Sequence, residues 1–269
     1  MPTKPRFPLK SPAPRVGLLG FGAFGRLLAG HLAGHFAMVI NDPALATGDT
    51  LPLPGTRAGT AAEAAGCDLV ILAVPLAALR ATARRIAPHL RPGSIVLDVT
   101  SVKVAPAAIM LAELPIFVDI VGTHPLFGPQ SARSGLRGHK IAVCPIRGRS
   151  APRIAAFLRR GLGLQVCFTT PEEHDREAAV VQGLTHMVAH VLVQMEPLPR
   201  RLTTASFERL MEAVEMVRYD APGVFLAIEG ANPYAAEVRE RFLTLAAETA
   251  HRLTSTATPH PGTKDEAAA

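Results

Sequence analysis

A glycine-rich run directly after a short apolar segment constrains the fold of this chain more than any other feature. Val16-Gly17-Leu18-Leu19 predicts a buried strand, and the chain then continues with six residues in which three glycines are spaced among apolar side chains. In such a strand–turn–helix unit the first glycine permits a tight turn, the second admits a pyrophosphate, and the third lets helix and strand pack closely. The start of the helix offers free N–H groups to phosphates. The pattern predicts a dinucleotide site at Gly20, Phe21, Gly22, Ala23, Phe24 and Gly25.

A carboxylate, Asp42, follows Gly20 by 22 positions, at the expected end of a second strand. There it would accept hydrogen bonds from the adenosine ribose of NAD and repel the extra phosphate of NADP. Asn41 is a rival for the ribose role, because sequence does not place a strand end to one residue. The alternative interpretation is a glycine-rich turn followed by a turn-forming Asn-Asp-Pro. We expect NAD as the cofactor, with NADP as the other possibility.

Short apolar runs alternate with helical stretches up to about residue 170. This alternation is typical of a parallel sheet with helices on both faces. We predict strands at 16–19, 37–40, 69–74, 94–99, 116–121, 140–144 and 164–168, and helices at 24–35 and 76–90.

The strand signal disappears after residue 170. Thr170-Pro171-Glu172-Glu173 predicts a capped helix start, and that helix is expected to run to about Met195. Further helices are expected at 206–218 and from Asn232 onward. We therefore predict an α/β Rossmann-like dinucleotide-binding domain followed by an all-α domain. The predicted divisions are a disordered leader at 1–14, the first domain at 15–170, the second at 171–253 and a disordered tail at 254–269.

Composition excludes several classes of protein. Apolar residues make up 48% of the chain, which excludes a disordered protein. The net charge of +6 comes without tryptophan or a compact basic run, so we expect anionic small molecules and no nucleic acid as partners. Three cysteines without a paired spacing favour free thiols in the reducing cytoplasm. The long uncharged run at 178–195 contains glutamine and histidine, so no membrane span is expected.

Two polar segments follow predicted strands. One is Asp98-Val99-Thr100-Ser101-Val102-Lys103, and the other runs from Gly122 through His124 to Ser131. The carboxyl ends of parallel strands meet at one edge of a sheet, where ligands bind. Serine and threonine also cap helices, and a lone histidine in an irregular loop is often merely solvated. The shared edge with the glycine-rich turn favours a site role for both segments.

Taken together, these motifs resemble the prephenate and arogenate dehydrogenases of tyrosine biosynthesis. The resemblance covers Gly20–Gly25, Ala73–Pro75, Asp98–Lys103, Gly122–Ser131, Glu172–Asp175 and Gln182–His186. That family joins a Rossmann-like domain to a helical domain that dimerises, so the resemblance implies a homodimer. It also implies oxidative decarboxylation of arogenate or prephenate, with hydride transfer to NAD⁺, to give tyrosine or 4-hydroxyphenylpyruvate.

The resemblance implies roles for single residues. His124 matches the catalytic histidine, and a neutral imidazole is suited to take the substrate's hydroxyl proton. Ser101 matches the serine that hydrogen-bonds the same hydroxyl and orients the histidine. His186 matches a position on the substrate side of the interdomain cleft. Val74, Pro75 and Thr100 are expected near the cofactor, and Thr123, Gln130 and Ser131 near the substrate.

One departure concerns the substrate's ring carboxylate. Many prephenate-specific members carry an arginine in the second helical segment, where this chain has Glu215, as plant-like arogenate enzymes do. The expectation leans toward arogenate, since Gln130, Ser131 or Glu215 would favour its ammonium group. Five arginines are open as carboxylate partners: Arg133, Arg137, Arg200, Arg201 and Arg218.

Four polar residues recur every four positions along the long helix: Gln182, His186, His190 and Gln194. A zinc site at the two histidines lacks a third ligand, so no metal is expected. We interpret His190 and Gln194 as buried groups that hydrogen-bond between helices.

Two other functions stay open. A different Rossmann-type oxidoreductase, of the imine or β-hydroxyacid type, would share the glycine motif and the helical half but not the segment at 122–131. A non-catalytic dinucleotide sensor would keep Asp42 but would need neither Ser101 nor His124.

Overall fold

The structure is a computed structural model that describes residues 14–220 and 222–255. The predicted leader at 1–14 lies outside the described residues except for Pro14. The predicted tail at 254–269 also lies outside them, except for its first two residues, which end the last helix.

An eight-stranded sheet fills the first half of the chain, in the order β3-β2-β1-β4-β5-β6-β7-β8. Neighbouring strands are parallel from β3 through β6, whereas β6 and β7 are antiparallel. The prediction of a parallel sheet is therefore wrong at this one pair. The strands are β1 (Arg15–Leu19), β2 (Ala37–Asn41), β3 (Thr56–Ala58), β4 (Leu69–Leu72), β5 (Ile95–Asp98), β6 (Asp119–Pro125), β7 (Lys140–Arg147) and β8 (Gln165–Phe168).

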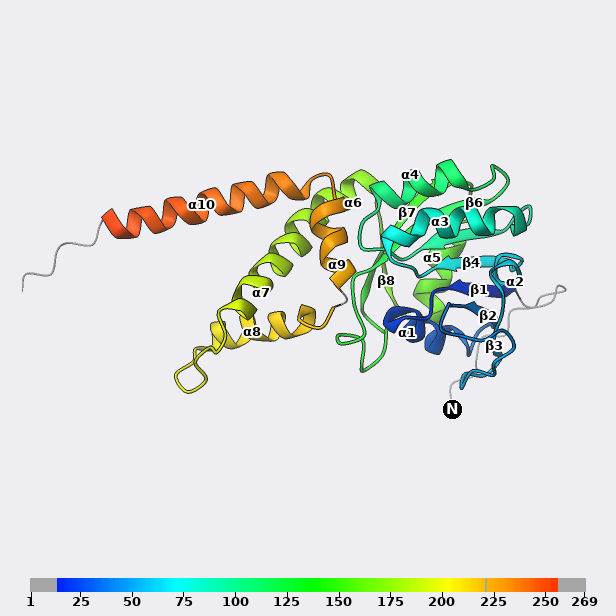
Figure 1. Ribbon diagram of the computed structural model, residues 1–269, viewed down its shortest axis with the longest axis horizontal. Helices are drawn as coiled ribbons and strands as arrows, with labels where there is room; N and C mark the ends of the chain where they lie inside the picture. The colour runs from blue at the N-terminus through cyan, green and yellow to red at the C-terminus, as the bar shows by residue number, and fades with distance from the viewer. Residues whose placement is uncertain (1–13, 221, 256–269) are drawn as a thin grey trace, which may run out of the picture.

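Helices cover both faces of the sheet (Figure 1). One core cluster packs α1 (Ala23–Leu32) and α5 (Ala151–Gly161) against one face. The other packs α2 (Ala61–Ala65), α3 (Leu76–Ile86) and α4 (Val104–Glu113) against the opposite face. A short 3₁₀ turn, η1 (Ala87–His89), follows α3. Strand side chains alternate between the clusters, which explains why these strands are continuous apolar runs in the sequence.

The second half is helical, as predicted. Its elements are α6 (Pro171–Ala178), η2 (Ala179–Gly183), α7 (Leu184–Gln194), α8 (Ala205–Val217), α9 (Pro222–Leu226), η3 (Ala227–Ala231) and α10 (Ala235–Ser255). The capping box at the start of α6 is confirmed, because Thr170 and Glu173 exchange side-chain-to-backbone hydrogen bonds of 3.2 Å. The predicted helix to about Met195 is confirmed as a continuous helical run from Pro171 to Gln194, within which one π-helical turn, η2, separates α6 from α7.

The helical half leaves much apolar surface exposed. Figure 1 shows α10 reaching away from the sheet half, and Ala235 is the one buried residue of this helix. The exposed large apolar side chains of this half are Val180, Val181, Val191, Met195, Leu202, Leu210, Met216, Tyr219, Leu226, Leu243, Leu245 and Leu253. In the described ranges, no helix combines the length and apolar character that a membrane crossing requires.

Candidate active site

The glycine-rich turn joins β1 to α1 at the carboxyl edge of the sheet. Gly20 has a φ of +102°, and a Cβ placed on it would lie 2.3 Å from the carbonyl oxygen of Ala73. A Cβ on Gly25 would lie 2.3 Å from the carbonyl oxygen of Gly20, so α1 packs tightly on the turn. Gly22 borders open space, and α1 begins after it, at Ala23, without a side-chain cap. The turn thus has the room and the free N–H groups that a pyrophosphate requires.

Asp42 faces this turn from the end of β2. Its Oδ2 accepts the N–H of Phe21 at 2.6 Å, and its Oδ1 accepts the N–H of Ala44 at 2.9 Å. The side-chain amide of the rival residue, Asn41, donates instead to the carbonyl of Gly59 at 2.9 Å. The backbone carbonyl of Asn41 accepts the N–H of Gly20 at 2.8 Å, but of the two side chains only that of Asp42 hydrogen-bonds to the glycine-rich turn.

The other predicted cofactor residues surround the same turn. Phe24, in the first turn of α1, lies 6.3 Å from Phe127 between ring centroids. Val74 follows β4, and its Cγ1 would lie 3.3 Å from a Cβ on Gly20. Pro75 follows Val74 and is the N-cap of α3. Of these residues, Val74 therefore borders the turn.

A buried network joins β5 to β6 behind this edge. The fully buried ammonium of Lys103 donates to the carboxylate of Asp98 and, at 2.6 Å, to the carbonyl of Thr123. The hydroxyl of Thr123 donates to the carbonyl of Asp98 at 2.6 Å, and the hydroxyl of Thr100 bonds to the Asp98 carboxylate. A buried charge needs such partners, because leaving it unpaired is costly. Thr100 and Thr123 thus belong to the hydrogen-bond network that holds the carboxyl ends of β5 and β6.

His124 lies inside β6, paired across the sheet with Ala142 of β7. The expectation of an irregular loop at this residue is wrong, because β6 continues through Pro125. Its side chain is buried, and this burial lowers the pKa of His124 well below the ordinary histidine value. The charges of His174 and Lys103 act in the same direction. At neutral pH, His124 is therefore a neutral imidazole with a free lone pair.

A second histidine holds the His124 ring. His124 Nδ1 lies 2.8 Å from His174 Nε2, and His174 Nδ1 lies 2.7 Å from Asp175 Oδ1. The buried Asp175 carboxylate also accepts the N–H groups of Lys103 at 2.7 Å and Val104 at 2.9 Å, at the start of α4. Through these contacts, α6 of the helical half reaches the carboxyl edge of the sheet.

Gln182 covers the other ring nitrogen of His124. Its side-chain nitrogen lies 3.4 Å from His124 Nε2, and its Oε1 is buried without a partner among the described residues. Gln182 belongs to the π-helical turn η2, and such single turns occur frequently at functional sites.

The loops beside His124 carry three other predicted site residues. Ser101 is half-buried in the loop after β5, and within residues 14–220 and 222–255 its hydroxyl makes no hydrogen bond. Gln130 has a buried Oε1 without a partner in the same ranges. The hydroxyl of Ser131 bonds to the N–H and the carbonyl of Gly128, at 3.0 and 3.3 Å, which closes the turn. Ser101 and Gln130 thus each have a polar side-chain atom without a partner among the described residues, whereas Ser131 is engaged locally.

His186 lies on α7, and its Nε2 is 3.9 Å from Oδ2 of Asp220. Burial lowers the pKa of His186 and raises the pKa of Asp220. A Cβ on Gly128 would lie 3.9 Å from Asp220 Oδ1 and 3.6 Å from Gln130 Oε1. The turn after α8 therefore meets the loop that follows His124.

The remaining histidine of the stripe lies outside this cluster. His190 stacks on Phe225 at 4.0 Å, and both His190 and Gln194 are exposed. Their interpretation as buried groups that hydrogen-bond between helices is wrong for this chain. Across the described residues, no three side chains of His, Cys, Asp or Glu gather as metal ligands would.

The candidate partners of a substrate carboxylate are placed unequally. Arg218 pairs with Glu196 and, at 2.8 Å, with Glu215, so two carboxylates already hold its guanidinium. Arg133 and Arg137 are exposed on the loop between β6 and β7, which also carries Gln130. Arg200 and Arg201 are exposed between α7 and α8.

Sequence reasoning missed four residues of this cluster: His174, Asp175, Gln182 and Asp220. His174 and Asp175 lie in the Glu172–Asp175 motif, where two adjacent titratable residues inside a capped helix were the available signal. Gln182 was placed in the polar stripe without a role, and Asp220 lies in the turn after α8 without any motif around it.

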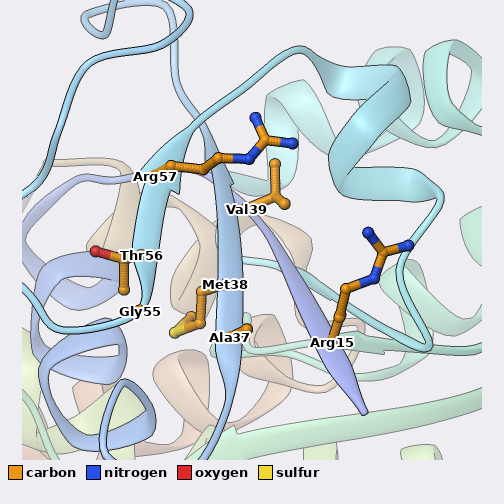
Figure 2. A pocket seen from close by; sticks show the side chains of 7 residues that line it. All are labelled: Arg15, Ala37, Met38, Val39, Gly55, Thr56 and Arg57. Atoms are coloured by element: carbon orange, nitrogen blue, oxygen red, sulfur yellow. The ribbon is translucent and has the colours of Figure 1, made fainter. Parts of the chain in front are cut away.

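A separate hollow of about 290 Å³ lies away from this cluster, against β1, β2 and β3 (Figure 2). Arg15 and Ala37, the first residues of β1 and β2, line it, so it opens toward the amino edge of the sheet. Figure 2 shows Arg57 extending from β3 beside Val39. The guanidinium of Arg57 pairs with Glu63 at 2.7 Å.

Two family profiles match the sequence. Residues 40–181 match the prephenate dehydrogenase nucleotide-binding domain, and residues 170–257 match the prephenate dehydrogenase dimerization domain. The first match begins at residue 40, after the glycine-rich turn, and so does not include it. A cofactor role for this turn is therefore argued from the geometry of the turn alone.

Two curated relatives are each 30% identical to this chain. Chloroplastic arogenate dehydrogenase 2 of Arabidopsis thaliana matches over 243 residues, which are 86% of this chain and 68% of the relative. A protein named probable arogenate/prephenate dehydrogenase, from Methanocaldococcus jannaschii, matches over 186 residues. That match covers 65% of this chain and 41% of the relative, so the chain spans less than half of that protein's length.

Solved structures share the fold. Prephenate dehydrogenase from Aquifex aeolicus, in complex with hydroxyphenyl propionate and NAD⁺, has a TM-score of 0.70 at 19% identity, with 93% of each chain covered. Arogenate dehydrogenase from Synechocystis has a TM-score of 0.66 at 21% identity, with 91% of this chain and 94% of that chain covered. At these identities, the likeness concerns the architecture of a nucleotide-binding sheet domain followed by a helical domain.

Proposed function

This chain belongs to the prephenate dehydrogenase family, and we propose that it oxidises and decarboxylates arogenate, with NAD⁺ as hydride acceptor and prephenate as the poorer substrate. One observation carries this proposal. A buried, neutral histidine, His124, stands at the sheet edge that also bears the glycine-rich turn, and its Nε2 faces the helical half.

The proposed reaction begins at a ring hydroxyl opposite a quaternary carbon that bears a carboxylate. His124 Nε2 accepts the hydroxyl proton, a role for which a positioned base contributes roughly 10²–10⁴-fold. A nicotinamide bound at this edge supplies the hydride acceptor for the carbinol carbon. Loss of carbon dioxide from the quaternary carbon then yields a phenol, and aromatisation drives the step. To the half-buried hydroxyl of Ser101, which has no partner in the described chain, we assign the hydrogen bond to the same oxygen.

The glycine-rich turn and Asp42 fit a dinucleotide. The open space at Gly22 and the uncapped start of α1 suit a pyrophosphate, and Asp42 suits the ribose hydroxyls. Its negative charge opposes a 2′-phosphate. Arg57, the nearest downstream cation, already pairs with Glu63, which further favours NAD⁺ over NADP⁺.

Cofactor choice is tested by kcat/KM for NAD⁺ and NADP⁺ on wild type and Asp42→Ala. We expect wild type to prefer NAD⁺ and the variant to lose most of that preference. Asp49→Ala, on the exposed loop after β2, is the matched control and should keep it. If wild type prefers NADP⁺, or if Asp42→Ala discriminates between the two cofactors as wild type does, Asp42 does not select the cofactor and only forms the turn.

The selection of arogenate rests on unpaired acceptors. Gln130 Oε1 and Gln182 Oε1 are buried without donors among the described residues. Asp220 adds a carboxylate whose side chain is 26% exposed, next to Gly128 and His186. The ammonium group of arogenate donates hydrogen bonds and carries positive charge, whereas the side-chain ketone of prephenate only accepts. Acceptors without donors therefore favour arogenate.

Asp220→Asn tests this selection. A hydrogen bond to a charged group contributes about 1.5–3 kcal/mol, so kcat/KM for arogenate should fall by roughly 10–100-fold. The value for prephenate should stay within about 3-fold, since a ketone loses no charged partner. Glu212→Gln, an exposed change of acid to amide on the preceding helix α8, is the matched control. An equal loss for both substrates would contradict the ammonium role.

Turnover itself is tested by absorbance at 340 nm with NAD⁺ and either substrate. NADH formation that depends on arogenate or prephenate is the expected result. Tight NAD⁺ binding without turnover would favour the sensor, and turnover with an imine or a β-hydroxyacid alone would favour another oxidoreductase.

The proposed assembly is a homodimer through the helical half. This half matches a dimerization domain and exposes the twelve large apolar side chains named above. A second copy of the same surface is the simplest way to cover them.

A further inference from the structure

We propose that His174 and Asp175 are positioning residues, which fix the hydrogen of His124 on Nδ1 and thereby leave Nε2 free to accept the substrate's proton. The inference rests on the proposed function, to which it adds two residues of the helical half. It starts from a chain of three side chains, each at hydrogen-bonding distance from the next.

The order of hydrogens along this chain follows from its carboxylate end. A carboxylate only accepts hydrogen bonds, so His174 Nδ1, 2.7 Å from Asp175 Oδ1, carries hydrogen. In a neutral ring the other nitrogen, His174 Nε2, then has a lone pair and accepts from His124 Nδ1 across 2.8 Å. With its hydrogen on Nδ1, the neutral His124 ring has its lone pair on Nε2.

The contacts of the amide of Gln182 agree with this arrangement. Its side-chain nitrogen, a donor, lies on the Nε2 side of His124 at 3.4 Å. The lone pair of Nε2 therefore points toward η2 and the helical half, where the substrate site is proposed.

Asp175 is held too firmly to serve as a mobile acceptor. Its side chain is fully buried, and its two oxygens accept N–H groups from Lys103 and Val104 at the start of α4. Its own carbonyl accepts the side-chain amide of Asn232 at 2.7 Å. The positive end of the α4 dipole stabilises the carboxylate there. Both halves of the molecule thus fix the group that orients His174.

The charged groups around the two rings define their response to acid. The loop after β5 contributes the ammonium of Lys103, which faces the site but is paired with Asp98. Helix α6 contributes His174 and Asp175. Strand β7 contributes no charge, because the residue opposite His124 is the apolar Ala142. A proton taken up at His124 Nε2 removes the lone pair that would accept the substrate's proton, so uptake of that proton abolishes activity.

The proton balance of the proposed step is simple. The hydroxyl O–H bond of the substrate breaks, and an N–H bond forms at His124 Nε2, without any electron transfer to the histidines. The positive charge that appears on His124 is stabilised through His174 by the carboxylate of Asp175. The proton later leaves Nε2 for water, which restores the neutral pair.

The hydrogen positions are measured directly by two-bond ¹H–¹⁵N spectra of full-length protein labelled at histidine. The His124 signals are assigned by their loss in His124→Asn. At a pH above that at which His124 takes up a proton, the wild-type spectrum should show hydrogen on Nδ1 of His124 and none on its Nε2. In Asp175→Asn the amide offers an N–H to His174, which reverses both rings and places hydrogen on His124 Nε2. We expect kcat to fall by roughly 10²–10⁴-fold and KM to change less than about 3-fold, as for a wrong tautomer in a catalytic triad.

Two further variants separate positioning from folding. Asn232→Ala removes a hydrogen bond to the Asp175 backbone without touching the two rings, so it should lower Tm but keep the His124 tautomer and most of kcat. His174→Phe removes the acceptor of Nδ1–H, so it should give His124 mixed tautomers and a reduced kcat even if Asp175→Asn does not fold.

Three results would overturn the inference. They are a wild-type His124 with hydrogen on Nε2, a folded Asp175→Asn protein with unchanged tautomer and kcat, or a loss of kcat in Asn232→Ala equal to that in Asp175→Asn. The tautomer is read without substrate, so a wild type that lacks turnover would refute the proposed function and leave this measurement intact.

Discussion

The sheet half and the helical half hold their functional side chains in different ways. In the sheet half, Lys103, Asp98 and Thr123 are buried and joined by hydrogen bonds within that half. The His124 ring is held from the helical half, by His174 and Gln182. In the helical half, the buried polar residues gather at the junction with the sheet, whereas α10 is almost wholly exposed. The sheet half therefore holds its own strand ends, but the ring of its histidine is fixed from the helical half. The helical half obtains its order from its contacts with the sheet and, in the proposed dimer, with a second copy.

The largest expected effect separates two histidines, one from each half. His124→Asn should lower kcat by roughly 10²–10⁴-fold, because it removes the positioned base, and should leave the Kd for NAD⁺ nearly unchanged. His190→Asn changes an exposed ring in α7 and should leave kcat within about 2-fold. Steady-state kinetics from pH 6 to 9 check both. Near-normal turnover of His124→Asn over this range would exclude His124 as the base.

The second effect concerns how each half covers its apolar surface. Leu245→Asp places a charge on the exposed face of α10 and should convert the dimer into monomers, because an unpaired charge in an apolar interface is costly. Ile116→Asp, at a more exposed apolar position in the sheet half (83% against 52% for Leu245), should leave the dimer intact. Sedimentation velocity at micromolar concentration checks both. A stable wild-type monomer would show that the helical half needs no second copy.

A third effect compares one glycine from each half. Gly20→Ala forces a side chain into positive φ and within 2.3 Å of the Ala73 carbonyl, so it should destabilise the fold by at least about 1–3 kcal/mol and weaken NAD⁺ binding. Gly230, in η3, has open space around its Cα, so Gly230→Ala should be neutral or slightly stabilising. Thermal unfolding and NAD⁺ titration measure both. Unchanged stability and NAD⁺ affinity in Gly20→Ala would contradict the positive φ and the close carbonyl contact described for this turn.

The smallest effect is the pH dependence of stability. Burial lowers the pKa of His124 and of His186, so between each lowered value and about pH 6.5 the unfolded chain binds more protons than the folded one. The free energy of unfolding should therefore rise with pH across this window, reach its full value above pH 6.5, and fall on acidification. His124→Asn and His186→Asn should each flatten the curve of Tm against pH below 6.5. An unchanged slope in either variant would show that this histidine is not desolvated.

The sequence predicted the sheet better than the helices, for physical reasons. Buried strands are continuous apolar runs, so all strands but β3 were found; Thr56-Arg57-Ala58 is too short and too polar to give that signal. The interruption at η2 was missed because its sequence stays apolar and helical in character on both sides.

The candidate site was predictable only where its residues share a strand end. Asp42 and His124 follow from that rule, since the carboxyl ends of parallel strands meet at one edge. His174 contacts His124 from 50 positions away, and Asp220 approaches Gly128 from another domain. No local pattern records such contacts, because they arise only when the helical half docks on the sheet.

The most direct test of the whole account is kcat/KM of the wild-type chain for arogenate and prephenate, each with NAD⁺ and with NADP⁺. The account predicts the highest value for arogenate with NAD⁺, because Asp42 selects the cofactor and Asp220 with the two unpaired glutamine oxygens selects the ammonium. No formation of reduced cofactor with either substrate would contradict the proposed activity. A highest value for prephenate with NADP⁺ would contradict both assignments of specificity.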